Sequence, residues 1–330
     1  MRVLLFLYLF LIPVCCSPKL TNSHSKNNET QLYDCHVHLM SPGLISDWKA
    51  IGIPFGRTEA NYFNIDTILS NVGATKIDLI GMGYVYENPE YFQGENPKEK
   101  LQEENDYLLE TTSKYPSKVR PFITVNPLRD YSNDEIERCF QSNKGIGLKL
   151  HFNASQVYLT EPEHLEKVKS IFEKASELQL PILLHFDNWH PKFGKDDLAL
   201  LVDSVLANLR PIKINMAHFG TSGGFSDKTK AFIVAYEKLR DKISERHTIY
   251  LDISAVALDK NSEGMNKLSD EEFKILNTYI HKIGIKHILF GTDYPLYNAS
   301  KYEEILLQKV GLNKKEIQII QTNSKKWMNE

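Results

Sequence analysis

The sequence predicts an α/β fold, a (β/α)8 barrel, on three observations. From residue 32 onward, short apolar segments alternate with longer segments of helical period, which is typical of parallel strands joined by helices. Eight such apolar segments can be counted, and eight is the number of strands in a TIM barrel. Several of them end in histidine, lysine or aspartate, and the C-terminal ends of the strands are where this fold places its chemistry.

The predicted strands are short, apolar and bounded by turn residues. In chain order they span residues 32–38, 77–82, 119–125, 145–151, 181–185, 212–218, 248–253 and 287–291. The helices expected between them are amphipathic, and most begin with Pro, Asp or Ser, which are common at helix starts. They span residues 97–115, 161–178, 195–208, 227–245 and 270–283, and two further helices at 302–310 and 314–328 end the chain. The alternative, an open doubly wound sheet, is disfavoured because no GxGxxG motif follows the first strand.

The composition is that of an ordinary globular protein. The 330 residues are 42% hydrophobic and 25% charged, which excludes collagenous and wholly disordered classes. One barrel commonly fills about 250 residues, so a single large domain accounts for most of the chain. The 39 basic and 42 acidic residues give a net charge of −3 without long blocks of one sign. We therefore expect a small-molecule substrate, and neither a nucleic acid nor a polybasic membrane contact. The oligomeric state is left open.

The first 17 residues are predicted to be a secretory signal peptide. A basic start is followed by an apolar run over residues 3–14 and by Cys15, Cys16 and Ser17. Because this run is shorter than the ~20 residues that a membrane-spanning helix needs, no integral membrane span is expected. The sequence thus predicts export to a periplasmic or extracellular location. A lipoprotein-type leader with a lipid anchor is the alternative, because a cysteine follows the run.

The remaining chain divides into two parts. Residues 18–31 are polar and are predicted to be a spacer, and residues 32–330 form the barrel domain. Only Cys35 and Cys139 remain after the leader, and we expect no structural disulfide between them.

Five polar residues at predicted strand ends point to a metal site. His36 and His38 are two residues apart, so on a strand both side chains face the same side. His185, His218 and Asp293 each end or follow a later apolar strand. Burying such groups without partners costs several kcal/mol each, and a divalent cation removes that cost.

The motifs that contain these residues are similar to those of a known superfamily. They are Gly-Leu-Lys-Leu-His at 147–151, Ala-His-Phe-Gly-Thr-Ser-Gly-Gly at 217–224 and Leu-Phe-Gly-Thr-Asp-Tyr-Pro at 289–295. Together with His-x-His on the first strand, they resemble the amidohydrolase superfamily. The nearest branch is the amidohydrolase-related one, which also contains the aminocarboxymuconate semialdehyde decarboxylases. The resemblance covers residues 32–327 and implies a TIM barrel of the metallo-dependent hydrolase type.

The resemblance implies roles for single residues. His36, His38, His185 and Asp293 would bind the metal, while His218 and Asp293 would be catalytic. Three imidazoles and one carboxylate suit one Zn²⁺ best, with Mn²⁺, Fe²⁺ or Co²⁺ as alternatives. No organic cofactor is expected.

Lys149 leaves the number of metals open. In binuclear members of the superfamily a lysine on the fourth strand is carbamylated and bridges two ions, with histidines of the fifth and sixth strands on the second ion. The amidohydrolase-related branch is usually mononuclear, so one metal is the preferred prediction. Lys149 would then contact the substrate or lie behind the ligands.

Other residues are candidates for substrate contact. His151 shares a strand face with Lys149, and Arg57 lies in the first long loop, where a guanidinium is suited to bind a carboxylate. Five aromatic residues in loops after strands are candidates for the wall of an apolar pocket: Trp48, Tyr84, Trp189, His190 and Tyr294.

These residues predict an enzyme, a metal-dependent hydrolase acting on an amide, ester or lactone of a small molecule. Such an enzyme activates water at the metal and stabilises the developing oxyanion. The alternative enzyme is a non-oxidative decarboxylase, a carboxy-lyase that uses the same metal residues. A barrel that binds metal without catalysis is the third possibility.

Overall fold

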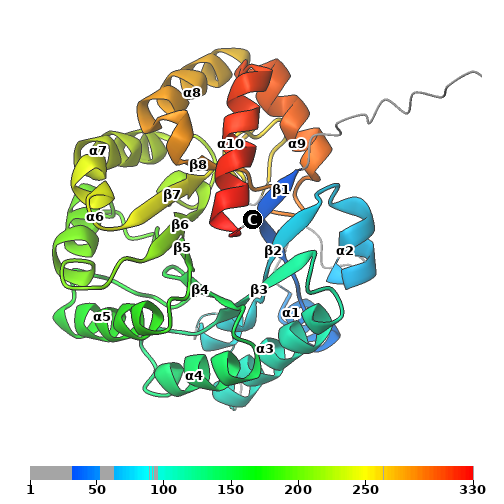
Figure 1. Ribbon diagram of the computed structural model, residues 1–330, viewed down its shortest axis with the longest axis vertical. Coiled ribbons are helices and arrows are strands. Elements are labelled where there is room, and N and C mark those ends of the chain that lie inside the picture. The colour runs from blue at the N-terminus through cyan, green and yellow to red at the C-terminus, as the bar shows by residue number, and fades with distance from the viewer. Residues whose placement is uncertain are drawn as a thin grey trace, which may run out of the picture. The chain divides into compact units, whose positions relative to one another are not determined.

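A computed structural model describes residues 32–52, 63–88, 90, 92, 96–262 and 264–329. Eight parallel strands pair in sequence order, from β1 next to β2 through to β8. The ends of this sheet also meet, because Cys35 N donates a hydrogen bond to Phe290 O at 2.9 Å and His38 N donates to Tyr294 O at 3.1 Å. The predicted (β/α)8 TIM barrel is therefore confirmed, and Figure 1 shows the ring of strands surrounded by helices.

The strands lie close to their predicted positions. They are β1 Tyr33–His38, β2 Lys76–Ile80, β3 Val119–Thr124, β4 Gly147–His151, β5 Ile182–His185, β6 Lys213–Met216, β7 Thr248–Asp252 and β8 Ile288–Leu289. The prediction was wrong at the end of the sixth strand, since His218 lies in the 3-10 turn η4 (Ala217–Gly220). The chain leaves the strand there because His218 and Phe219 adopt left-handed φ angles of 53° and 54°.

Helices cover the outside of the barrel, and most begin with a capping residue. They are α1 Pro42–Ala50, α2 Ile65–Asn71, α3 Pro97–Ser113, α4 Ser132–Ser142, α5 Pro162–Glu177, α6 Lys195–Leu200, α7 Asp227–Ser244, α8 Asp270–Ile283, α9 Ala299–Ile305 and α10 Lys314–Trp327. The side chains of Ser226 and Ser269 accept hydrogen bonds from the first turns of α7 and α8. None of the helices in the described part has both the length and the apolar character that a membrane span needs.

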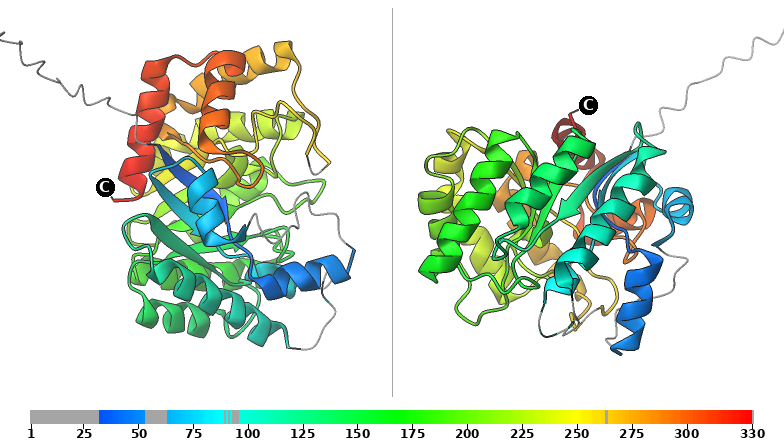
Figure 2. Two further views of the ribbon diagram at one scale, coloured as in Figure 1. Left: turned by 90° about the vertical axis from the view of Figure 1, so that its right-hand side faces the viewer. Right: turned by 90° about the horizontal axis from the view of Figure 1, so that it is seen from below.

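Helix α10 packs against one end of the barrel. Its Trp327 is fully buried and donates a hydrogen bond from Nε1 to Asp78 Oδ2 on β2 at 2.6 Å. Arg120 on β3 forms two hydrogen bonds with the same carboxylate, at 2.8 and 2.9 Å. In Figure 2, α10 and α1 lie at opposite ends of the barrel. Since α1 follows the C-terminal end of β1, the C-terminal ends of the strands lie at the end of the barrel opposite α10. The functional site is expected at that end.

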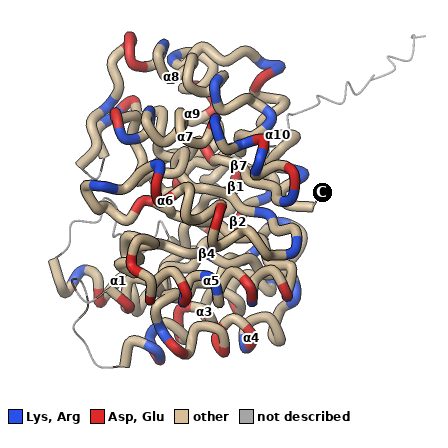
Figure 3. The backbone as a smooth tube through the Cα atoms, turned by 90° about the vertical axis from the view of Figure 1, so that its left-hand side faces the viewer, with Lys and Arg blue, Asp and Glu red and all other residues tan. Residues whose placement is uncertain are grey.

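The barrel interior is filled by close packing. Gly147 on β4 has no room for a side chain, because a Cβ there would lie 2.3 Å from the ring of Phe122 on β3. Acidic and basic positions alternate along the backbone of the helices on the side of the molecule that Figure 3 shows. The predicted leader (1–17), the whole of the predicted spacer (18–31) and Arg57 lie outside the described residues.

Candidate metal centre

Strands β1 and β8 bring three potential ligands together. His36 and His38 lie on β1, and Asp293 follows β8. The Asp293 Oδ1 atom is 3.0 Å from His38 Nε2 and 3.4 Å from His36 Nε2. These three side chains form one of the two groups of potential ligands, with atoms within 4.8 Å of one another, found among the described residues. The structure thus places His36, His38 and Asp293 next to one another, and their role as metal ligands stays a prediction.

The protonation of His36 suits a metal ligand. Its Nδ1 lies 3.0 Å from Asp252 Oδ2 and donates to that carboxylate, which leaves the lone pair on Nε2. This Nε2 atom is buried and has no hydrogen-bond partner in the described part of the chain. A buried imidazole nitrogen without a partner, beside a carboxylate oxygen, fits a divalent cation. Burial also lowers the pKa of His36 to about 3, so the ring is neutral.

Asp293 is held in an unusual backbone conformation. Its φ angle is 56°, in the left-handed region that aspartate tolerates but seldom adopts. Burial would raise the pKa of its carboxyl, but the hydrogen bond with His38 and the nearby imidazoles hold this pKa far below its usual range. The side chain is thus a carboxylate that can bind a cation or accept a proton.

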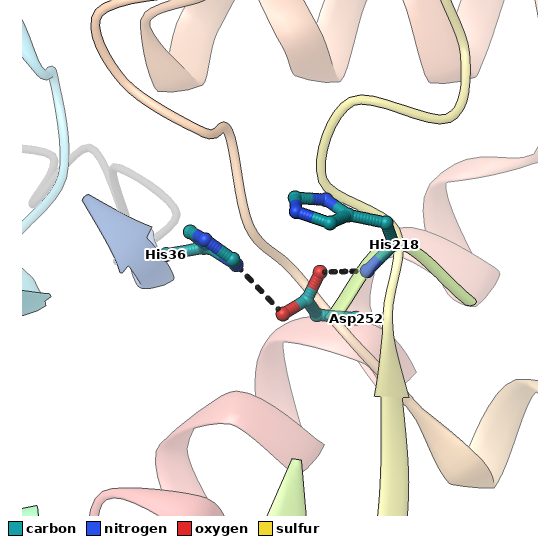
Figure 4. A group of neighbouring side chains, drawn as sticks. All are labelled: His36, His218 and Asp252. Carbon is teal, nitrogen blue, oxygen red and sulfur yellow. Dashed lines mark hydrogen bonds and ion pairs between the residues drawn. The ribbon is translucent and has the colours of Figure 1, made fainter. Parts of the chain in front are cut away.

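Asp252 at the end of β7 forms hydrogen bonds with both His36 and His218, and the sequence analysis did not identify it. It accepts hydrogen bonds from His36 Nδ1 and from the backbone N of His218 at 3.0 Å (Figure 4). It also accepts one from Asn215 Nδ2 at 2.9 Å. Ser254 N also donates to it, at 3.1 Å. Burial opposes ionisation, but the nearby His36 and His218 and the hydrogen bonds from the His36 ring and the Ser254 side chain bring the pKa of Asp252 to about 2.

Asp252 also belongs to the second group of potential ligands, with His36 and His218. We interpret this group as a hydrogen-bond network, because both oxygens of the fully buried carboxylate already accept from donors. An acidic residue in Leu-Asp-Ile-Ser at the end of a predicted strand was the only signal in the sequence.

His218 faces the same centre from the turn η4 that follows β6. Its Nδ1 lies 2.9 Å from the backbone oxygen of Ser254, which can only accept, so Nδ1 carries the proton. Nε2 is therefore the ring nitrogen that is left for other partners. The ring centroid of His218 is 4.7 Å from that of His36. The left-handed φ of His218 is the kind of strain that clusters at functional sites.

His185 and His151 form a second pair of rings. They are stacked, with centroids 3.9 Å apart and an angle of 10° between the planes. Ala154 N donates to Nδ1 of His151 at 3.1 Å, so the neutral His151 ring carries its proton on Nε2. Burial lowers the pKa of both rings well below the usual value. His185 lies outside both groups of potential ligands, so its role as a metal ligand stays a prediction.

Lys149 is the buried cation of the site. The residue is only 1% exposed, and no described carboxylate lies within ion-pair distance of its Nζ. Burial lowers its pKa to about 8, although Asp252 and Asp293 partly oppose this shift. Lys149 therefore provides either a positive charge or a neutral amine close to physiological pH.

A cavity of about 810 Å³, a size typical of small-molecule sites, opens at this centre. The residues of the centre that line it are His36, His38, Lys149, His151, His185, His218 and Asp293. Of the five loop aromatics singled out from the sequence, Trp48, Tyr84 and Trp189 line the cavity, whereas His190 and Tyr294 are not among its lining residues. No arginine lines it within the described part, so a guanidinium that binds a carboxylate is not found there.

Comparisons with known proteins agree with this architecture. Similar solved structures include a 2,6-dihydroxybenzoate decarboxylase complexed with 2,6-dihydroxybenzoate, which is 15% identical with a TM-score of 0.62 over 91% of this chain and 99% of that chain. Another is a dihydroxybenzoic acid decarboxylase from Polaromonas sp. JS666 with bound manganese, 15% identical with a TM-score of 0.60 over 91% and 97%.

A third similar structure is a probable 2-pyrone-4,6-dicarboxylic acid hydrolase from Acinetobacter baumannii, which is 16% identical with a TM-score of 0.55 over 91% and 100%. At these identities, the similarity shows the fold alone. A search of curated proteins gives no match. Residues 33–310 match the sequence model of a family described as amidohydrolase, and this match covers most of the chain. The resemblance stated from the motifs is thereby confirmed, and the chain belongs to the amidohydrolase family.

Proposed function

We propose that this protein is a metal-dependent hydrolase that acts on an amide, ester or lactone of a small molecule. The convergence of His36 Nε2, His38 Nε2 and Asp293 Oδ1 carries this proposal, because three such atoms form the core of a divalent metal site. We propose His185 as the fourth ligand and Zn²⁺ as the metal. The manganese in a similar structure makes Mn²⁺ the alternative.

The bound cation would supply two effects: it polarises the substrate carbonyl and makes water more acidic. Asp293 accepts a proton from the attacking water, because its carboxylate is ionised and lies beside the histidines of β1. As the new C–O bond forms, the C–N or C–O bond to the leaving group breaks, and the leaving group takes up a proton. His218 takes the water proton from Asp293 at Nε2 and passes it to the leaving group, since its Nδ1 is fixed by Ser254.

Two other residues orient the substrate. Nε2 of His151 carries a proton and is a neutral hydrogen-bond donor in the cavity wall. Nζ of Lys149 donates when charged and attracts a developing negative charge. Both side chains belong to β4, so they act on the same side of the substrate.

A metal-dependent decarboxylase is the second candidate, and Lys149 is the observation that favours it. A buried cation without a described carboxylate partner is suited to hold the carboxylate of a substrate. In that reaction the C–C bond to the carboxylate breaks, CO₂ leaves, and the carbon takes up a proton through His218. Two of the similar structures named above are decarboxylases, which supports the same alternative.

The two reactions differ in their products. The metal-loaded protein would be incubated in ¹⁸O-labelled water with matched panels of amides, esters, lactones and carboxylated aromatics. We expect ¹⁸O in a product acid, dependent on metal and lost in His218→Ala. CO₂ release that depends on both metal and His218, without labelled acid from any panel, would replace hydrolysis by decarboxylation.

A further inference from the structure

The side chain of Trp189 stands out at the mouth of the cavity. It is 66% exposed, whereas the other two tryptophans, Trp48 and Trp327, are 5% and 0% exposed. Trp189 also lines the cavity, so its indole borders both the solvent and the space above the metal centre. A large apolar side chain in this position leaves a flat surface for a ligand to cover.

The loop that carries Trp189 fixes its position. The backbone of Trp189 has a φ of 61°, a left-handed conformation that is rare for a bulky residue and costs free energy. The buried Asp187 stabilises it by accepting from Trp189 N at 2.8 Å, and Lys228 forms an ion pair with the same carboxylate oxygen at 2.7 Å. Asn188, also buried, donates to Val157 O at 3.1 Å. The contacts of Asp187 and Asn188 thus fix the backbone that carries the exposed ring.

The indole is also fixed at its polar edge. Trp189 Nε1 donates to Ser222 Oγ at 2.8 Å, across the loops that follow β5 and β6. With its only polar atom paired, the ring offers its apolar face for contact. A fixed aromatic face favours another flat ring, since stacking needs a defined plane on both partners.

Trp189 lies nearer to the solvent than the metal centre does. It follows the end of β5 by four residues, and the last residue of β5, His185, is the proposed fourth ligand. His36 and His185 are 0% and 6% exposed, whereas Trp189 is 66% exposed. A substrate with its scissile bond at the metal centre therefore extends outward to the mouth of the cavity to reach Trp189.

We propose that Trp189 forms a subsite that stacks on an aromatic ring at the end of the substrate distal to the metal. Lys149 and Lys260 also line the cavity, and their charges disfavour a cationic ring. The subsite therefore takes a neutral or anionic aromatic group. This inference rests on the proposed metal centre for the orientation of the substrate, and it narrows the substrate to aryl-substituted compounds.

The test compares chelating probes with and without a ring. Acetohydroxamate, benzohydroxamate and 3-phenylpropionohydroxamate are titrated into the metal-loaded protein by calorimetry. We expect at least one aryl probe to bind more tightly than acetohydroxamate. In Trp189→Ala, the affinity for that aryl probe is expected to fall by roughly three- to tenfold, while the affinity for acetohydroxamate stays unchanged. Trp189→Phe is expected to keep most of the aryl preference, and Ser222→Ala to lose part of it.

His190→Ala is the matched control, because His190 is the next residue in the loop and is not among the lining residues of the cavity. An aryl preference that survives in Trp189→Ala, or an equal loss for acetohydroxamate, would overturn the subsite.

If the wild-type protein does not bind acetohydroxamate, the proposed metal centre is contradicted. The subsite is then tested separately with 3-phenylpropionamide, which does not chelate a metal. Saturable quenching of tryptophan emission by this amide, lost in Trp189→Phe, still supports the subsite. Absence of such quenching overturns it.

Discussion

The hydrogen-bond partner of Nδ1 determines which ring nitrogen of each site histidine carries the proton. Asp252 accepts from Nδ1 of His36, and the Ser254 carbonyl accepts from Nδ1 of His218. His151 is reversed, because Ala154 N donates to its Nδ1. The same residue type therefore leaves Nε2 as the available acceptor on β1 and in the turn η4 and provides a hydrogen-bond donor on β4, a division of roles that the proposed hydrolysis uses.

Replacing His218 separates catalysis from metal binding. Asp293 and the β1 histidines remain in His218→Ala, so metal content is expected to stay at the wild-type level. The rate is expected to fall by roughly 10² to 10⁴, because a positioned acid–base group is lost. Elemental analysis and steady-state rates on the same samples check this. Loss of the metal would make His218 a ligand and favour the binuclear arrangement with Lys149.

Asp252→Asn tests the network behind the ligands. An amide in place of the carboxylate weakens the hydrogen bond that holds the His36 tautomer, so metal affinity is expected to fall about 10- to 100-fold. Competition with a chelator measures the change. Asp259→Asn is the control, because Asp259 pairs with Tyr297 away from the centre. Equal affinities for wild type and Asp252→Asn would show that Asp252 does not support the ligand.

The sequence predicted the proposed ligands better than it predicted their support. His36, His38 and Asp293 were found because imidazoles and a carboxylate that end apolar strands need a cation to offset the cost of their burial, and the structure brings them together. Asp252 was missed because a lone aspartate at a strand end is common, and its role depends on partners distant in sequence. The stacking of His151 on His185 likewise depends on the register of β4 and β5.

At the scale of the elements, the alternation of strands and helices determined the fold. The periodicity predicted all eight strands, because parallel strands buried on both faces form continuous apolar runs. It placed His218 inside a strand, since the departure from β6 comes from left-handed φ angles that no pattern of apolar residues signals. The packing of α10 against the barrel could not be predicted from the sequence either, because it depends on contacts between Trp327, Asp78 and Arg120, which are distant in sequence.

Helix α10 is expected to contribute strongly to stability without taking part in catalysis. Trp327→Ala removes a fully buried indole that packs beneath Arg120, so the free energy of unfolding is expected to fall by about 3–5 kcal/mol. Urea unfolding measures this, with the partly exposed Ile275→Ala as control, for which less than about 1 kcal/mol is expected. A loss in Trp327→Ala as small as in the control would mean that α10 is not needed to close the barrel.

At the scale of the whole molecule, buried histidines make stability depend on pH. Burial lowers the pKa of His36 to about 3 and those of His151 and His185 well below their usual value. Between about pH 4 and 6.5, the unfolded chain binds protons on these residues that the folded chain does not, so stability rises with pH. Asp34 makes stability fall as pH rises, because burial raises its pKa to about 7 and the folded chain keeps a proton that the unfolded chain loses.

Because several buried histidines oppose the single Asp34, unfolding takes up protons in this pH range. The metal-free protein is therefore expected to lose stability on acidification from pH 6 to pH 5. Urea unfolding at pH 5 and pH 6 measures the slope. A flat profile, or greater stability at pH 5, would mean that these histidines are charged in the folded protein.

Export, by contrast, concerns the whole chain but depends only on residues 1–17, and it stays a prediction. Mass spectrometry of the mature N-terminus checks it: a chain that begins near Ser17 is expected, and an intact Met1 in the cytosol contradicts it.

The metal content of the purified protein tests the central claim most directly. Elemental analysis is expected to find about one divalent metal per wild-type chain and little in His36→Ala or His38→Ala, with both variants folded because the core of a barrel this large does not depend on a metal. His164→Ala, which replaces a histidine away from the centre, is expected to match the wild type. Near-stoichiometric metal retained in both His36→Ala and His38→Ala would contradict the metal centre and the hydrolytic function proposed from it.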